Sequence, residues 1–231
     1  MEPMSVIGDI SAWVLPVILA VTLHEAAHGW MAERFGDPTA RVSGRVTFNP
    51  LKHIDPWGTL LLPGLLLLVH SPVLFGYAKP VPVDFRRLRP PRLGMLAVAA
   101  AGPGMNFLLA LGSALLLHLD AAVAPERAPW LYANLSRSLV VNCALGVFNL
   151  LPILPLDGGR VLRSLLPEAL GAAYARSERF GLLFVITLLM LPALLGITIV
   201  ADALSILVEG MVRALLFISG NDQAVLNEMA M

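Results

Sequence analysis

Charged residues are scarce in this sequence. Only 14% of its 231 residues are Asp, Glu, Lys or Arg, against about 25% in ordinary soluble domains, while 57% are hydrophobic. The 16 basic and 16 acidic side chains cancel, which argues against a nucleic-acid-binding protein. A single cysteine, Cys143, excludes an internal disulfide framework. These shortages exclude a typical soluble domain and favour an integral membrane protein.

Long apolar runs are abundant instead. Crossing a membrane takes about 20 apolar residues in a helix, and six segments approach that length. They span about residues 10–32, 57–78, 93–119 and 135–156, with two more inside 180–220. We therefore expect an all-α polytopic membrane protein.

The Lys and Arg residues predict how these segments are oriented. If the basic clusters lie in the cytoplasm, all basic residues except Arg127 and Arg137 face it, including Arg213 near the end of the last segment. Basic clusters then lie on both sides of segment 57–78, so it should enter and leave by one face. Its Pro63-Gly64 break suits a re-entrant hairpin packed within protein. We expect five spans plus this re-entrant segment, with six full spans as the alternative.

Three ionisable residues interrupt the first apolar segment in the pattern His24-Glu25-x-x-His28. Histidines four apart share one face of a helix and can bind one metal ion. In such motifs the glutamate acts as general base at a zinc site. Each ionisable side chain costs on the order of a few kcal/mol in lipid, so a purely structural role is hard to justify. Catalytic zinc takes three protein ligands, which requires one more from elsewhere.

Asp157 is the best candidate for that third ligand. It lies in "NLLPILPLDGGR" (149–160), at the end of a segment that should run parallel to the first one. Asp-Gly alone is usually a turn signal, but the matching depth favours a ligand. We expect the other histidines, His53, His70 and His118, to lie in loops or at the membrane interface.

Four blocks together resemble the site-2 protease family of intramembrane zinc metalloproteases. The blocks are "HEAAH" (24–28), "AGPGMN" (101–106), "NLLPILPLDGG" (149–159) and "FGYAKPVPVD" (75–84), the last resembling short bacterial members without PDZ or CBS domains. The resemblance implies one Zn²⁺ held by His24, His28 and Asp157, with Glu25 as the catalytic base. It also implies substrate contacts, which we assign to Asn149, Asn106, Gly76, Tyr77, Ala78, Lys79 and Pro80. For both asparagines, hydrogen bonding between helices is the alternative.

The resemblance further implies a single domain over 1–231, with a catalytic core at about 10–165 and a C-terminal helical hairpin at about 180–220. Residues around 76–84 would form a membrane-associated β-hairpin or loop. The expected activity is cleavage of single-span membrane proteins or peptides in a bacterial cytoplasmic membrane, with the active site toward the cytoplasm. The expected partners are these substrates and the lipid bilayer, without nucleic acid; a regulatory membrane partner or homo-oligomer is left open.

A membrane metal transporter or metal-binding protein could use the same ligands, and we keep it as the alternative function. Transporters are usually built from repeated halves, whereas this sequence has one ligand cluster and no internal repeat.

Overall fold

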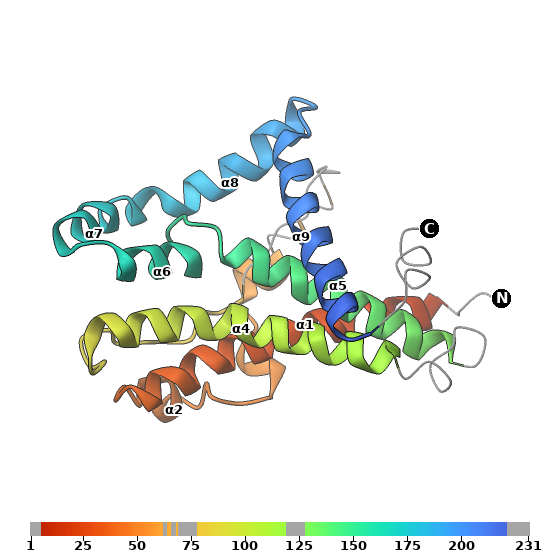
Figure 1. Ribbon diagram of the computed structural model, residues 1–231, viewed down its shortest axis with the longest axis horizontal. Coiled ribbons are helices and arrows are strands. Elements are labelled where there is room, and N and C mark those ends of the chain that lie inside the picture. The colour runs from red at the N-terminus through yellow and green to blue at the C-terminus, as the bar shows by residue number, and fades with distance from the viewer. Residues whose placement is uncertain (1–5, 62–63, 66–67, 69–77, 119–127, 221–231) are drawn as a thin grey trace.

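Helices are the only regular elements in the part of the chain that the computed structural model describes, residues 6–61, 64, 65, 68, 78–118 and 128–220. Three of them are long and apolar enough to cross a membrane: α1 (Val6–Arg34), α4 (Pro91–His118) and α5 (Pro129–Asn149). They correspond to the first, third and fourth predicted segments and form one bundle (Figure 1). The all-helical class is therefore confirmed.

The boundaries of α5 differ from the predicted range 135–156. The helix begins at Pro129, because proline is well suited to the first turn, where its missing N–H is not needed. It ends at Asn149, since Pro152 and Pro155 follow and a proline cannot donate the hydrogen bond that would extend the helix. Asp157 consequently begins a separate helix, α6 (Asp157–Leu165), after a turn.

Polar contacts show that α1 and α5 run in the same direction. Arg137 pairs with Asp9 at 3.2 Å, and Trp130 Nε1 donates to Ser11 Oγ at 2.9 Å, so their N-terminal ends lie together. This confirms the parallel arrangement expected from the sequence. Small residues let the three helices approach closely, as in many membrane bundles. Those buried include Ala12, Ala20, Ala26, Ala27, Ala99, Gly102, Ala110 and Ala114.

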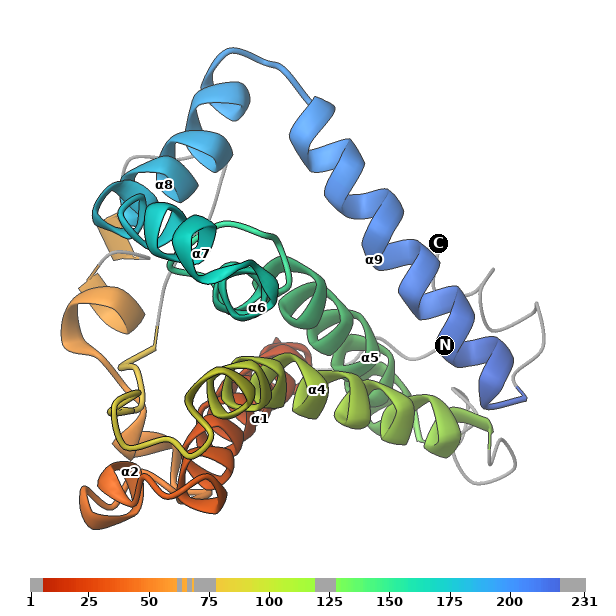
Figure 2. The same cartoon turned by 60° about the vertical axis from the view of Figure 1, so that its left-hand side comes forward.

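The C-terminal helices leave the bundle and return to it. After α6 come α7 (Glu168–Ala175), α8 (Glu178–Leu194) and α9 (Ile199–Ile218). Figure 2 shows α8 and α9 diverging from the turn that joins them, with α9 descending onto α4 and α5. There Val212, Leu215 and Leu216 pack with residues of α4 and α5, Leu117 and Leu135 among them.

This packing corrects one expectation. Arg213 was predicted to face the cytoplasm with the other basic clusters, yet its neighbours Val212 and Leu215 pack with the C-terminal half of α4. The cluster around Arg92 lies at the opposite end of α4, where Arg92 Nη2 donates to Ser164 O of α6 at 3.1 Å. The hydrophobicity of the sequence did not indicate that the end of α9 packs against the C-terminal half of α4. The prediction of six segments in the membrane remains a prediction, since three helices among the described residues meet the length and composition of a span.

The described residues between α1 and α4 include three short elements. These are α2 (Thr39–Val42), η1 (Pro50–Lys52) and the π-helical turn η2 (Pro56–Leu61). Residues 78–84 are extended but form no strand, so the β-hairpin alternative finds no support within the described residues. Most of segment 57–78 lies outside them, and whether it spans or re-enters stays a prediction.

A buried aspartate ties this region to the bundle. Asp37, fully buried just after α1, accepts hydrogen bonds from Thr39 N at 3.1 Å and from Asp84 N at 2.7 Å through its two carboxylate oxygens. The same oxygen that faces Thr39 N also accepts from the Thr39 hydroxyl. One carboxylate thus fixes both the turn after α1 and the end of the extended segment 78–84.

We predict that Asp37→Ala destabilises the protein by about 2 kcal/mol, because it leaves two part-buried backbone N–H groups without their partner. Thermal unfolding of the detergent-solubilised protein measures this loss. Asp202→Ala is the matched control, since that exposed carboxylate accepts only a side-chain bond from Thr198 within its own helix end. Equal losses in the two variants would contradict the anchoring role of Asp37.

Candidate active site

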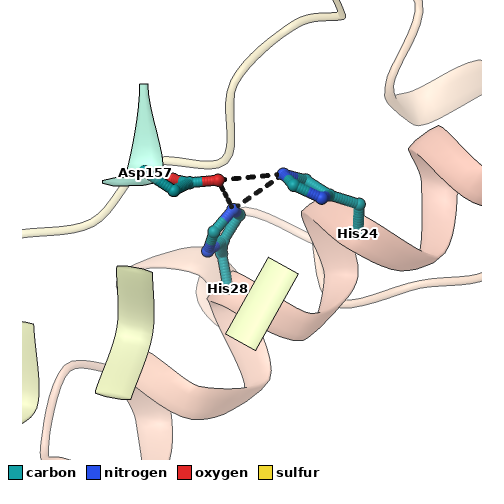
Figure 3. Close-up of side chains that lie close together, drawn as sticks. All are labelled: His24, His28 and Asp157. Atoms are coloured by element: carbon teal, nitrogen blue, oxygen red, sulfur yellow. Dashed lines mark hydrogen bonds and ion pairs between the residues drawn. The ribbon is translucent and has the colours of Figure 1, made fainter. Parts of the chain in front are cut away.

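Three side chains from two helices converge at one point inside the bundle. His24 and His28 lie one turn apart on α1, and Asp157 is the first residue of α6 (Figure 3). The two Nε2 atoms are 3.0 Å apart, and Asp157 Oδ2 lies 3.2 Å from that of His24 and 3.3 Å from that of His28. Their exposures are only 8%, 9% and 5%. The structure therefore brings together the three residues predicted as metal ligands.

Hydrogen bonds to α4 orient both imidazole rings. His28 Nδ1 lies 2.7 Å from the backbone oxygen of Val98, which can only accept, so Nδ1 carries the proton. His24 Nδ1 lies 2.7 Å from Asn106 Oδ1, also an acceptor. In this state each Nε2 keeps a lone pair, and both lone pairs face Asp157. Such outer partners are the usual means of fixing metal-binding histidines.

This donor set fits a metal ion. Each of the three residues offers one ligand atom, and all three atoms lie within 4.8 Å of one another. Electron-rich atoms at this separation repel unless a proton or cation lies among them. Tetrahedral zinc with bonds near 2.0–2.2 Å spaces its ligand atoms about 3.3 Å apart, close to what is observed. No other group of three or more such residues occurs among the described residues.

Gly102 on α4 makes room for the two rings. A Cβ atom at this position would lie 2.4 Å from His28 Nε2 and 2.6 Å from His24 Cε1, far inside contact distance. The helix backbone itself therefore forms one wall of the site. Only glycine allows this approach without moving the histidines.

The turn 150–156 delivers Asp157 to α1. It folds α6 back onto the end of α5 so closely that a Cβ on Gly158 would lie 2.1 Å from Leu150 O. A Cβ on Gly159 would lie 2.5 Å from Leu154 N. Close backbone packing therefore requires the two glycines, and the acidic residue that begins α6 points toward the histidines.

Glu25 lies beside this cluster and faces a pocket. Its Oε2 accepts a hydrogen bond from Val81 N at 2.9 Å, which links α1 to the extended segment 78–84. The pocket has a volume of about 510 Å³, and its wall includes Glu25 and the three converging side chains. Other wall residues are Ala78, Pro80, Val81, Val83, Phe85, Asn149 and Arg160. A carboxylate, a potential metal site and a peptide-sized cavity thus share one space.

The residues predicted to contact substrate lie in four different settings. Asn149, Ala78 and Pro80 line the pocket. Lys79 donates its backbone N–H to His53 O at 2.9 Å and is not part of the wall. Gly76 and Tyr77 lie outside the described residues.

Asn106 lies in a different setting, away from the pocket wall. It is fully buried, and its amide contacts His24 Nδ1, Ala20 O and Asn142 Oδ1. This surrounding suits a residue that holds His24 in place better than one that touches substrate. Hydrogen bonding between helices was the alternative that the sequence had left open.

Sequence reasoning missed several contributors to the site. Gly102 lay inside the quoted block "AGPGMN", but nothing in the sequence showed that its missing side chain faces the histidines. Val81 carried a usable signal, because it supplies the only backbone N–H in the run Pro80-Val81-Pro82. Asn142 lies inside the apolar segment 135–156 and belongs to no recognised motif, so the sequence offered no reason to assign it to the site.

The proteins to which this sequence is similar include proteins named as zinc metalloproteases, in agreement with the metal-site geometry described above. The model of peptidase family M50 matches residues 12–126 and 128–192. The chain is 38% identical over 183 residues to "Putative zinc metalloprotease YwhC" of Bacillus subtilis, covering 78% of this chain and 80% of that protein. It is 31% identical over 193 residues to "Putative zinc metalloprotease Rip2" of Mycolicibacterium smegmatis, covering 84% and 72%.

A more distant relative is "Zinc metalloprotease MJ0392" of Methanocaldococcus jannaschii. The identity there is 26% over 181 residues, covering 77% of this chain and 41% of the relative. No solved structure gives a significant match.

We predict that Gly102→Ala weakens zinc binding at least about tenfold, because the added methyl group displaces both imidazole rings. Competition with a chromophoric chelator measures the dissociation constant in detergent. Gly104→Ala is the matched control, since a Cβ at that position of the same helix meets nothing within 4 Å. Retention of full affinity in Gly102→Ala would show that the rings do not need this space.

Proposed function

The chain belongs to peptidase family M50, and from this membership we propose that it is a zinc-dependent endopeptidase cleaving peptide bonds within or near transmembrane segments. One observation supports this proposal above all: His24, His28 and Asp157 converge beside Glu25 on the wall of one pocket. Both histidines and Glu25 belong to an apolar helix. Relatives that bear the name zinc metalloprotease support both the metal and the reaction class.

In this proposal, His24, His28 and Asp157 hold the zinc ion through two neutral imidazoles and one carboxylate. Three protein ligands leave one coordination position open, as catalytic zinc sites require. A bound zinc ion supplies Lewis acidity, which makes a water molecule more acidic and polarises the scissile carbonyl. Val98 O and Asn106 Oδ1 keep the two imidazoles in the tautomer that can bind metal.

Glu25 performs the proton transfers. Its carboxylate takes a proton from water as the water oxygen bonds to the scissile carbonyl carbon, and then gives it to the leaving amine as the C–N bond breaks. The Val81 N–H holds Oε2 and turns the carboxylate toward the pocket, which leaves the second oxygen for the proton. Asn149 lines the same wall and donates one amide hydrogen to Leu145 O at 3.0 Å; its second amide hydrogen would donate to the developing oxyanion.

The membrane setting narrows the substrate class. His24, Glu25 and His28 belong to a helix that is long and apolar enough to span a bilayer, so the chemistry would occur at membrane depth. A transmembrane helix hides its peptide bonds in its own hydrogen bonds and must unwind before cleavage. The segment 78–84 runs along the pocket, and its backbone carbonyl oxygens could accept hydrogen bonds from the unwound chain. Its N–H groups are less available, because those of Lys79 and Val81 already donate to His53 O and to Glu25. We propose single-span membrane proteins or peptides as substrates.

The site would face the cytoplasm of a bacterial cell. Its end of the bundle carries Arg34 at the end of α1 and Arg86, Arg87, Arg89 and Arg92 before and within the start of α4. Basic residues prefer the cytoplasmic side of a membrane. Arg160 on the pocket wall, paired with Glu178 at 3.8 Å, would lie on the route by which water enters.

We predict that Glu25→Gln slows peptide cleavage by about 10²–10⁴-fold while zinc stays bound, because the amide cannot accept the proton. The assay follows a single-span reporter in liposomes, with zinc content measured on the same sample. His24→Ala should lose both zinc and cleavage.

Glu33→Gln provides the control for removing a charge from α1. Glu33 pairs with Arg41 and has no contact with the pocket, so this variant should cleave at the wild-type rate. Undiminished cleavage by Glu25→Gln would refute the proteolytic assignment of Glu25.

A further inference from the structure

A buried chain of hydrogen bonds runs from the candidate metal site across all three long helices. His24 Nδ1 meets Asn106 Oδ1 at 2.7 Å, and Asn106 Nδ2 donates to Asn142 Oδ1 at 3.0 Å. Asn142 Nδ2 in turn donates to Ser138 O at 2.9 Å and approaches Ser138 Oγ at 3.3 Å. The exposures of Asn106 and Asn142 are 0% and 1%.

Two backbone oxygens fix the direction of this chain. A carbonyl oxygen only accepts hydrogen bonds, so Ser138 O requires the NH₂ group of Asn142 to face it. The oxygen of Asn142 must then face Asn106. Ala20 O accepts a hydrogen bond from Asn106 Nδ2 at 3.2 Å, so the NH₂ group of Asn106 must likewise face this oxygen. With both hydrogens of Asn106 used, its Oδ1 faces His24.

The consequence reaches the metal site. Because Asn106 presents an oxygen, His24 Nδ1 must carry a proton, and in the neutral ring Nε2 then keeps the lone pair that points to Asp157. A reversed Asn106 amide would favour the other tautomer, whose Nε2 carries a proton and cannot bind metal. It would also set its oxygen against the oxygens of Ala20 and Asn142.

We propose that Asn142 is a positioning residue for the metal site, acting through the Asn106 amide to hold His24 in its metal-binding tautomer. The proposal rests on the proposed function of His24 as a zinc ligand. Asn142 is not part of the pocket wall and does not contact His24, so it takes no part in the chemistry itself. It acts by fixing the orientation of the side-chain amide of Asn106, to which it is hydrogen-bonded.

Simple packing explains this arrangement less well. Apolar side chains at positions 106 and 142 would fill the helix interface without burying two amides. Polar pairs between membrane helices typically contribute only about 0.6 kcal/mol, so stability alone is a weak reason for the chain. By contrast, loss of an outer partner of a metal ligand typically costs about 10–100-fold in metal affinity.

The test uses the full chain in detergent with ¹⁵N-labelled histidine. Long-range ¹H–¹⁵N spectra of the zinc-free protein report the tautomer of each ring, and His24→Ala assigns the His24 signals. Asn142→Leu should move His24 away from the pure Nδ1–H tautomer. Its zinc affinity, measured by chelator competition, should fall about 10–100-fold. Asn142→Ala, which removes the same groups without adding bulk, should do the same.

Leu139→Ala is the matched control. Leu139 is fully buried on α5, three residues from Asn142, but belongs to the apolar cluster and not to the hydrogen-bond chain. It should lower the thermal stability while leaving both the His24 tautomer and the zinc affinity unchanged. If Leu139→Ala and Asn142→Leu lost zinc affinity to the same extent, Asn142 would have only a structural role.

The proposal is overturned if Asn142→Leu or Asn142→Ala folds and keeps either the wild-type tautomer or the wild-type zinc affinity. A wild-type protein that binds no zinc would instead refute the proposed function. In that case the tautomer spectra of the zinc-free variants still report on Asn142, so the two failures can be told apart.

Discussion

Mutual repulsion among three electron-rich atoms is the constraint on which this structure depends. Two imidazole nitrogens and a carboxylate oxygen lie 3.0–3.3 Å apart in the interior of an apolar bundle. Left uncompensated, such a group would be expensive in a membrane, where ionisable side chains are rare and usually functional. A zinc ion held by all three residues, as we propose, would turn the repulsion into bonds. The surrounding helices then have one task in common, which is to keep these atoms together before the ion arrives.

Helix α4 performs much of that task, although it supplies no ligand. Its Val98 carbonyl and Asn106 amide orient the two rings, and Gly102 lets its backbone approach them. Helix α5 contributes indirectly, through the contact of Asn142 with Asn106 and through the turn after α5 that presents Asp157. On the opposite side, the Val81 N–H holds Glu25, and Asp37 anchors the segment to which Val81 belongs. The proposed metal ligands, the proposed base and the pocket are thus positioned by separate parts of the chain.

Much of this site could be predicted from the sequence, because its chemistry follows short-range rules. Helical periodicity placed His24 and His28 on one face, and the charge pattern set α5 parallel to α1, which brought Asp157 to their depth. Gly102 and Asn142 could not be assigned, since their roles depend on which atoms α4 and α5 present to a neighbouring helix. Arg213 was misplaced because hydrophobicity does not reveal where a helix returns to the bundle. The end of α5 was placed too late, beyond the prolines that stop it.

X-ray absorption at the zinc edge tests the central claim most directly. It should be measured on the zinc-loaded full chain in detergent, after one equivalent of metal has bound. We expect two imidazole nitrogens and light oxygen donors around zinc, with this imidazole signal halved or lost in His28→Ala. A sulfur neighbour, which only Cys143 or a methionine could supply, would contradict it. So would a zinc spectrum that His28→Ala leaves unchanged.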